Sequence, residues 1–251
     1  MMINPKKIYD LLIDYGQTNT PVEEIIIGLT WTLCKAEGIG LCMSPGIPTR
    51  TLSWSGTLVN QPMQELSSWL RSWDAYQATV AMAGINAIIN HNSPLQQEAI
   101  ALPGATSANL SVFEHFLPQL QGKQVSVIGR YPGLKQYEQQ MNINVIELNP
   151  TPGDFPATAS EYLLPESDWV FLTATSIPNK TFPRLVELSR DATVVLMGPT
   201  LPWLREFADF GINYLAGVTV SNSTALRQTV AEGGGVRIFE TGVQYHLLSL
   251  G

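Results

Sequence analysis

The segment Val125-Ser126-Val127-Ile128-Gly129 is the first of four short, mostly apolar stretches in the second half of the chain. The others are residues 144–148, 169–173 and 193–197, and most of the intervening segments are of helical length. Short apolar strands that alternate with helices are typical of a parallel sheet covered on both faces. The sequence therefore predicts an α/β fold with a Rossmann-like, mostly parallel, doubly wound sheet.

Two further segments are expected to extend this sheet. Residues 213–220 are predicted to form a fifth strand. Residues 236–249 are predicted to form a closing hairpin that turns at Thr241-Gly242, since glycine favours turns.

The first half of the chain has a different pattern. Residues 22–33 are rich in Val, Ile, Leu and Trp and predict a strand, and residues 39–43 predict the strand that returns after a turn. Residues 62–90 then show helical spacing, with Asp74 placed to cap a helix. This pattern predicts an α+β unit.

The two patterns divide the chain into expected domains. We expect an α+β domain over residues 1–92, a linker over residues 93–105 and a Rossmann-like domain over residues 106–251. Ser93-Pro94 and Pro103-Gly104 interrupt the sequence within the expected linker.

Composition excludes several classes of partner. The 251 residues carry 14 Lys and Arg against 21 Asp and Glu, so the net charge is −7. Nucleic acids and anionic membranes attract basic surfaces, so neither is an expected partner. No apolar run approaches the roughly 20 residues of a membrane span. We expect a soluble cytoplasmic protein, and the sequence leaves a homodimer open.

The loops at the predicted strand ends hold the candidate ligand-binding residues. Ligands of open parallel sheets bind beyond the carboxyl ends of the strands. Two such loops contain Thr-x-Pro, as Thr181-Phe182-Pro183 and Thr200-Leu201-Pro202. Threonine caps helices, and proline is tolerated in a first turn. Both loops are therefore predicted to begin helices. The helix N-termini either bind a polar or anionic ligand in one crevice or are merely well capped.

Ten residues form the candidate ligand-binding set. Most lie in these loops, and Asn86 interrupts a small, apolar helical segment that ends in Asn90. The two amides either bind the adjacent hairpin or lie against the second half of the chain. The set comprises Asn86, Gly129, Glu147, Thr175, Ser176, Asn179, Lys180, Gly198, Pro199 and Thr200.

The first predicted strand leads into a loop that resembles a dinucleotide loop only by position. Gly129-Arg130-Tyr131-Pro132-Gly133 lacks the third glycine of G-x-G-x-x-G and contains a proline. Glu147, near the end of the second strand, has the place where dinucleotide folds often bind a ribose.

The residues that bind soft metals are few. Cys34 and Cys42 flank the predicted turn, and a three-residue turn would place them on one face of the hairpin, whereas a two- or four-residue turn would not. His91, His115 and His246 are scattered. We therefore predict no preformed zinc-type site. A metal is expected to bind weakly through oxygen ligands or to arrive on a small chelator.

Several segments of the chain together resemble one prokaryotic family. They are Ile128-Gly129, Glu147-Leu148-Asn149-Pro150, residues 163–170, residues 173–181, residues 198–202 and Leu215-Ala216-Gly217. The family is known as the putative heavy-metal chelation domain. Residues 28–32 and 84–87 are similar to its usual N-terminal partner domain.

This resemblance implies an architecture and a place for a site. It implies an enolase-N-terminal-like domain, a Rossmann-like domain and a site in the cleft between them. One residue departs from the expected pattern, because Ala174 stands where Thr-Gly-Thr is expected. A methyl group there would restrict a ligand that approaches the backbone.

Three classes of function follow. The first is the binding, with or without enzymatic processing, of a small polar or anionic ligand or a metal chelate in the cleft, with Glu147 or Asp154 as oxygen ligands or as a base. The second is a transferase or other enzyme that uses a nucleotide-like cofactor. The third is a non-catalytic scaffold. The sequence does not identify a cofactor beyond a metal ion or metal chelate, nor a catalytic residue.

Overall fold

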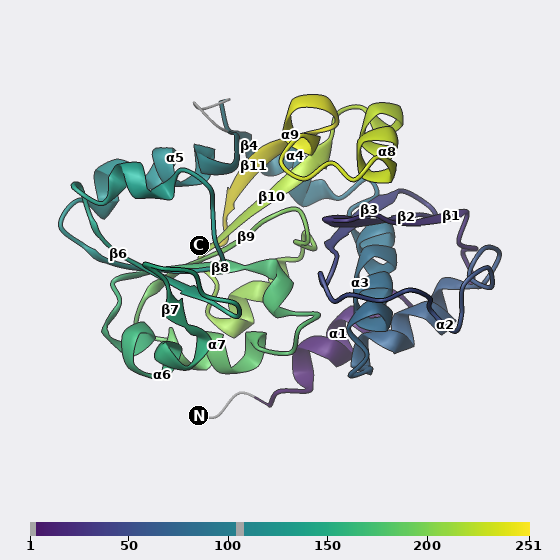
Figure 1. Ribbon diagram of the computed structural model, residues 1–251, viewed down its shortest axis with the longest axis horizontal. Coiled ribbons are helices and arrows are strands. Elements are labelled where there is room, and N and C mark those ends of the chain that lie inside the picture. The colour runs from purple at the N-terminus through teal and green to yellow at the C-terminus, as the bar shows by residue number, and fades with distance from the viewer. Residues whose placement is uncertain (1–3, 104–107) are drawn as a thin grey trace.

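The computed structural model describes residues 4–103 and 108–251, which form two β-sheets with helices packed around them (Figure 1). The smaller sheet has three strands in the order β1-β2-β3, and the larger has eight in the order β4-β11-β10-β9-β8-β5-β6-β7. No helix among these residues is long and apolar enough to cross a membrane.

The smaller sheet is an antiparallel meander of β1 (Glu24–Ile27), β2 (Trp31–Lys35) and β3 (Ile39–Met43). The single strand predicted over residues 22–33 is wrong, because the chain turns after β1, where the Gly28 amide donates to the Trp31 carbonyl. Lys35 pairs with Ile39, so the second turn has three residues. Cys34 and Cys42 consequently share one face, and both are fully buried.

Helix α3 (Ala75–Ile89) packs against this sheet. Asp74 caps it as predicted, since its carboxylate accepts from the Gln77 amide at 2.9 Å. Gly40 in β3 permits the close approach, because a Cβ there would lie 2.1 Å from the Ala83 carbonyl oxygen. The other helices of this half are α1 (Lys7–Tyr15), α2 (Met63–Ser68) and η1 (Trp69–Arg71).

The larger sheet confirms the predicted α/β class. Six neighbouring strands, from β10 to β7 in the sheet order, are parallel, and β11 and β4 extend the β10 edge in antiparallel pairings. The strands are β4 (Ile100–Ala101), β5 (Gln124–Ile128), β6 (Asn142–Glu147), β7 (Phe155–Pro156), β8 (Trp169–Thr173), β9 (Thr193–Met197), β10 (Tyr214–Val220) and β11 (Val243–Ser249).

The hairpin predicted over residues 236–249 is wrong. Helix α9 (Ile238–Thr241) occupies its first half, and only β11 is a strand, paired with β10. Ile238 is fully buried in the core, so tertiary packing decides the helical turn. In the segment expected to be a linker, helix α4 (Pro94–Glu98) precedes β4, and residues 104 and 105 lie outside the described residues.

Helices cover both faces of the larger sheet (Figure 1). On one face lie α5 (Ser111–Leu120), α8 (Ser223–Ala231) and α9; on the other lie α7 (Phe182–Leu188) and the 3₁₀ helix η7 (Arg205–Phe210). The short helical elements are α6 (Ser160–Leu163), η2 (Ala108–Leu110), η3 (Leu134–Tyr137), η4 (Ala157–Ala159), η5 (Leu164–Glu166) and η6 (Ala174–Ser176).

Both halves of the chain contribute to both hydrophobic cores. One core joins Cys34, Cys42 and the buried side of α3 to α7 and to Leu172 of β8. The other joins Trp31 and Leu33 of the small sheet to α5 and α8. The small sheet thus lies between α3 and α8, and the two halves share buried apolar surface.

Candidate functional site

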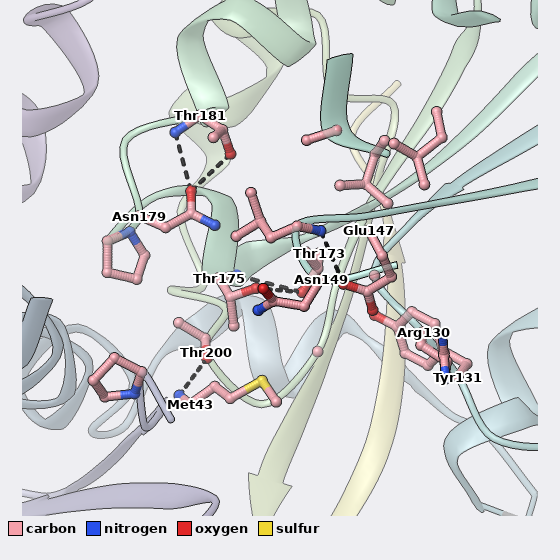
Figure 2. Close-up of a pocket in the computed structure, with 18 of the residues that line it drawn as sticks. Met43, Arg130, Tyr131, Glu147, Asn149, Thr173, Thr175, Asn179, Thr181 and Thr200 are labelled. Carbon is pink, nitrogen blue, oxygen red and sulfur yellow. Dashed lines mark hydrogen bonds between the residues drawn. The ribbon is translucent and has the colours of Figure 1, made fainter. Parts of the chain in front are cut away.

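A cavity of about 1030 Å³ lies at the carboxyl ends of β5, β6, β8 and β9. Its opposite wall comes from the small sheet, the segment that follows β3, and α3, including Trp31, Met43 and Thr79. Figure 2 shows the polar side chains of the strand ends directed toward one space. Of the ten predicted residues, all except Asn86 and Ser176 line this cavity.

Two glycines at strand ends shape the floor of the cavity. Gly129 follows β5 with a φ of 102°, and Gly198 follows β9 with a φ of 112°. Residues with a side chain rarely adopt this left-handed conformation. A Cβ at Gly198 would lie 4.0 Å from the Tyr131 hydroxyl. The backbone at Gly198 is therefore open to a bound molecule, whereas a Cβ at Gly129 would contact the Thr173 side chain at 3.4 Å.

The loop after β8 forms its own hydrogen-bonded structure. The Thr173 and Thr175 hydroxyls lie 2.9 Å apart. The Asn179 side-chain oxygen accepts from the Thr181 amide at 3.0 Å and from the Thr181 hydroxyl at 2.7 Å (Figure 2). Thr181 precedes α7 as predicted, but its side chain forms no capping hydrogen bond to the helix among the described residues. Asn179 instead holds Thr181 in place, and Asn179 Nδ2 has no hydrogen bond among the described residues.

The loop after β9 corrects the second predicted helix start. Residues 201–204 are not helical, and η7 begins only at Arg205. The Thr200 hydroxyl instead accepts from the Met43 amide at 3.0 Å, and the Thr200 carbonyl accepts from Asn86 at 2.8 Å. Contacts with the first half of the chain therefore hold this loop extended.

Two amides on α3 fasten the same loop. Asn86 Nδ2 donates to the carbonyls of Leu41 and Thr200, both at 2.8 Å. Asn90 Nδ2 donates to the Leu201 carbonyl at 3.1 Å, and its oxygen accepts from the Trp203 amide at 3.0 Å. Asn86 thus binds both the hairpin and the second half of the chain, so both alternatives drawn from the sequence hold for it, and Asn90 binds the second half. Asn86 supports the cavity wall without lining it.

Two buried residues of the loop after β8 also do not line the cavity. Ser176 is fully buried, and its hydroxyl has no hydrogen-bond partner in the described structure. Ala174 is fully buried as well. The expected restriction by the Ala174 methyl group is therefore absent, because that methyl group is not part of the cavity wall.

Lys180 connects the cavity to the first half of the chain. Its Nζ donates to the carbonyls of Leu70 at 2.5 Å and Pro178 at 3.2 Å, and lies 5.1 Å from the centre of the Tyr9 ring. Burial lowers the pKa of this ammonium from 10.5 to about 8. An ammonium has three N–H donors, and these two carbonyls accept from two of them.

The acidic residues of the cavity region differ in what they can bind. Glu147 accepts only from the Leu148 amide, at 3.2 Å, and it forms no ion pair within the described structure. Asp154 is largely buried, pairs with Arg130 and accepts from the Thr151 amide. Of the two carboxylates that the sequence analysis considered, Glu147 and Asp154, only Glu147 is therefore available to bind a ligand.

Several cavity residues were missed by sequence reasoning. Arg130 and Tyr131 directly follow Gly129, so the strand-end rule that selected Gly129 could have found them. Three aromatic residues of the wall were also missed: Trp31, Phe239 and Tyr245. Either the structure of their segment was predicted incorrectly, or the position of that segment relative to the sheet ends was not predicted.

The available donors do not fit a soft-metal site. Among residues 4–103 and 108–251, no group of three or more His, Cys, Asp or Glu side chains is placed to hold a metal ion. Cys34 and Cys42 are fully buried, and burial raises the pKa of each thiol to about 12, so neither readily supplies a thiolate.

The fold and the cavity define an α/β protein with a ligand-sized pocket at the carboxyl edge of a Rossmann-like sheet. Two family models match the chain, both described as "Putative heavy-metal chelation": DUF364 over residues 111–249 and DUF4213 over residues 9–89. The chain belongs to this family, which confirms the resemblance seen in the sequence.

Individual relatives agree with this assignment. An uncharacterized protein of Methanocaldococcus jannaschii is 27% identical over 169 residues, which span 64% of this chain and 62% of that relative's length. A DUF364 protein of unknown function from Desulfitobacterium hafniense matches with a TM-score of 0.84 and 28% identity over 98% of both chains. One from Pyrococcus horikoshii shares the fold, with a TM-score of 0.80 and 19% identity over 98% of this chain and 100% of that chain.

Proposed function

We propose that the cavity binds a small polar or anionic ligand, including a metal ion already held by an organic chelator. The observation that carries this proposal is Lys180, a cavity-lining residue whose ammonium has no carboxylate partner among the described residues. Hydrogen bonds to a charged group contribute about 1.5–3 kcal/mol, so a ligand carboxylate would gain from this lysine. The unpaired Asn179 Nδ2 adds a second donor.

The chemistry of the donors supports a chelate over a bare metal ion. A soft-metal site needs three or four thiolate or imidazole ligands, and among the described residues no cysteine or histidine lines the cavity. A metal held by a polycarboxylate chelator would present anionic oxygens to Lys180 and Asn179. The protein would then recognise the organic part of the complex.

Calorimetry with defined probes tests this proposal. We would titrate the full chain with citrate, with nickel–citrate and with nickel alone. Lys180→Met removes the ammonium and keeps a long side chain, and Lys6→Met is the control because Lys6 is exposed and outside the cavity. We expect Lys180→Met to weaken binding of citrate or nickel–citrate by about tenfold to 150-fold.

Three outcomes would contradict the proposal. One is the absence of citrate and nickel–citrate binding to the wild-type chain. A second is equal binding by the Lys180→Met and Lys6→Met variants. The third is a submicromolar zinc site without organic ligand that is lost on His91→Ala or on substitution of both Cys34 and Cys42. Metal analysis and native mass spectrometry of the purified protein would identify any ligand that co-purifies.

A further inference from the structure

The strand order places a ligand-binding position within this cavity. From one edge inward, the parallel strands run β7-β6-β5-β8-β9-β10, so β5 is the first strand in sequence and the order reverses between β5 and β8. This is the doubly wound 3-2-1-4-5-6 arrangement, in which ligands bind outside the strand ends at the reversal point. The cavity occupies that place, because Gly129 and Thr173 at these two strand ends line it.

Glu147 has the geometry of a ribose acceptor in such a sheet. It ends β6, the strand beside β5, and its carboxylate faces the cavity without an ion-pair partner among the described residues. In sheets of this order, an acidic residue after the second strand accepts hydrogen bonds from ribose hydroxyls. A carboxylate has about four lone-pair sites, so the Leu148 amide leaves room for two hydroxyl donors.

Aromatic side chains also line the cavity. Tyr131, Phe239 and Tyr245 are all in its wall, and the rings of Phe239 and Tyr245 stack with centroids 5.0 Å apart. The Glu147 carboxylate raises the pKa of the Tyr131 phenol, which burial raises more strongly, so these two groups lie near each other (Figure 2). Flat apolar rings beside a carboxylate suit a base attached to a ribose.

The usual support for a pyrophosphate is missing from the loop after β5. A dinucleotide places its pyrophosphate on the N-terminus of the helix that follows the first strand. Here β5 is followed by η3, a 3₁₀ helix of four residues, and Arg130 in the loop is paired with Asp154. The loop also contains Pro132, which lacks an amide donor.

We infer that the cavity binds a ribonucleoside-type ligand without a diphosphate over the β5 loop, and that Glu147 accepts hydrogen bonds from its ribose hydroxyls. This inference rests on the proposed function and specifies its ligand class. Lys180 and Asn179, on the far side of the loop after β8, would then contact a polar or anionic substituent of the same ligand.

Nucleoside pairs that differ in one hydroxyl test the inference. We would measure binding of adenosine, guanosine, cytidine and uridine, and of their 2′-deoxy counterparts, to the full chain by calorimetry and by saturation-transfer NMR. At least one ribonucleoside should bind at least tenfold more tightly than its deoxy form. Glu147→Gln should weaken the binding of that ribonucleoside by tenfold or more and should remove most of the preference for ribose over deoxyribose. The diphosphate of the same nucleoside should bind no more tightly than the nucleoside.

A matched variant controls for indirect effects. Glu138 is exposed, follows the same β5 loop and lies outside the cavity, so Glu138→Gln removes the same charge from the chain without touching the site. The Glu138→Gln variant should bind the ribonucleoside with the affinity of the wild type and should show the same preference for ribose. Thermal unfolding of both variants would verify that each is folded.

The inference is overturned if none of the four ribonucleosides binds at millimolar concentration. It is also overturned if ribose and deoxyribose bind equally, or if Glu147→Gln and Glu138→Gln behave alike. These results leave the proposed function intact when citrate or nickel–citrate still binds in a Lys180-dependent manner. Conversely, the inference would stand and the anion-binding role of the cavity would be contradicted if ribonucleosides were preferred while citrate binding did not depend on Lys180.

Discussion

The loops after β8 and β9 carry the same Thr-x-Pro sequence and adopt different structures. In the first, Phe182 and Pro183 begin α7, the Thr181 side chain forms no capping hydrogen bond to the helix, and Asn179 accepts hydrogen bonds from Thr181 itself. In the second, no helix begins near Thr200, and its hydroxyl and carbonyl bind the first half of the chain. A local motif thus limits the conformations of a loop, and the neighbouring elements select one of them.

The largest expected effect tests the contacts that select the second conformation. Asn86→Ala removes the donor for the buried carbonyls of Leu41 and Thr200. Leaving buried acceptors unpaired costs about 1–3 kcal/mol each, so we expect the free energy of unfolding to fall by about 3 kcal/mol.

Urea denaturation measures this change. Asn142→Ala is the control, because Asn142 is exposed and we expect its replacement to cost less than about 0.5 kcal/mol. Equal losses in the two variants would show that α3 does not hold the loop after β9.

The second prediction concerns charge, because the loop after β8 contributes Lys180 to the cavity lining whereas the loop after β9 contributes no charged residue. Because the pKa of Lys180 is lowered to about 8, its ammonium is present below that pH and is lost above it. Affinity for citrate should fall by about tenfold between pH 7 and pH 9. Lys180→Met should bind weakly and show no such fall, as calorimetry at each pH would measure.

Rising pH is expected to change the stability of the fold in the opposite direction to the affinity for citrate. The folded state releases this proton at a lower pH than the unfolded state, so the contribution of Lys180 to the free energy of unfolding rises between pH 8 and pH 10.5. A wild-type affinity that is constant across pH 7 to 9 would exclude Lys180 as the anion-binding group.

The third prediction compares the two threonines directly. Thr200→Val keeps the side-chain shape and leaves the Met43 amide without its acceptor, at an expected cost of about 1.5 kcal/mol. Thr181→Val removes only a partly exposed hydroxyl, at an expected cost of about 0.5 kcal/mol. Thermal and urea unfolding of both variants measure the difference. The reverse ranking would mean that the threonine side chain, after all, stabilises the start of α7.

The last prediction isolates the role of the Asn179 side chain in holding Thr181. Asn179→Ala removes the acceptor for the Thr181 amide and should cost about 1 kcal/mol. Asn179→Asp keeps that acceptor and should restore most of the stability, while removing the amide donor from the cavity. Citrate binding to the Asp variant should therefore weaken although its unfolding is close to that of the wild type.

The parallel strands could be predicted because their information is local. β5, β8, β9 and β10 are within one residue of their predicted ends, since buried parallel strands are continuous apolar runs. The two-residue strands β4 and β7 have no such pattern and exist only because a neighbouring strand offers hydrogen bonds. Helix α9 is fixed in the same way by burial of Ile238.

The residues of the candidate site could be predicted from the sequence to the same extent as the strands of the fold. The strand-end rule found Gly129, Glu147 and Gly198, because sheet topology brings those positions together. It could not show that Asn86 supports the wall from behind or that Ser176 is buried, because both depend on how α3 and η6 pack. The pairing of Asp154 with Arg130 likewise depends on loop structure.

The position of the small sheet between α3 and α8 has a consequence for synthesis on the ribosome. Trp31, Leu33 and Leu41 face a core completed by Leu226 and Val230, which are translated long after them. Until α8 emerges, that face of the meander is uncovered, and exposed apolar sheet surface promotes aggregation of nascent chains. The N-terminal half therefore completes its packing only once α8 has been synthesised, and we expect a chain truncated before α8 to expose that apolar face.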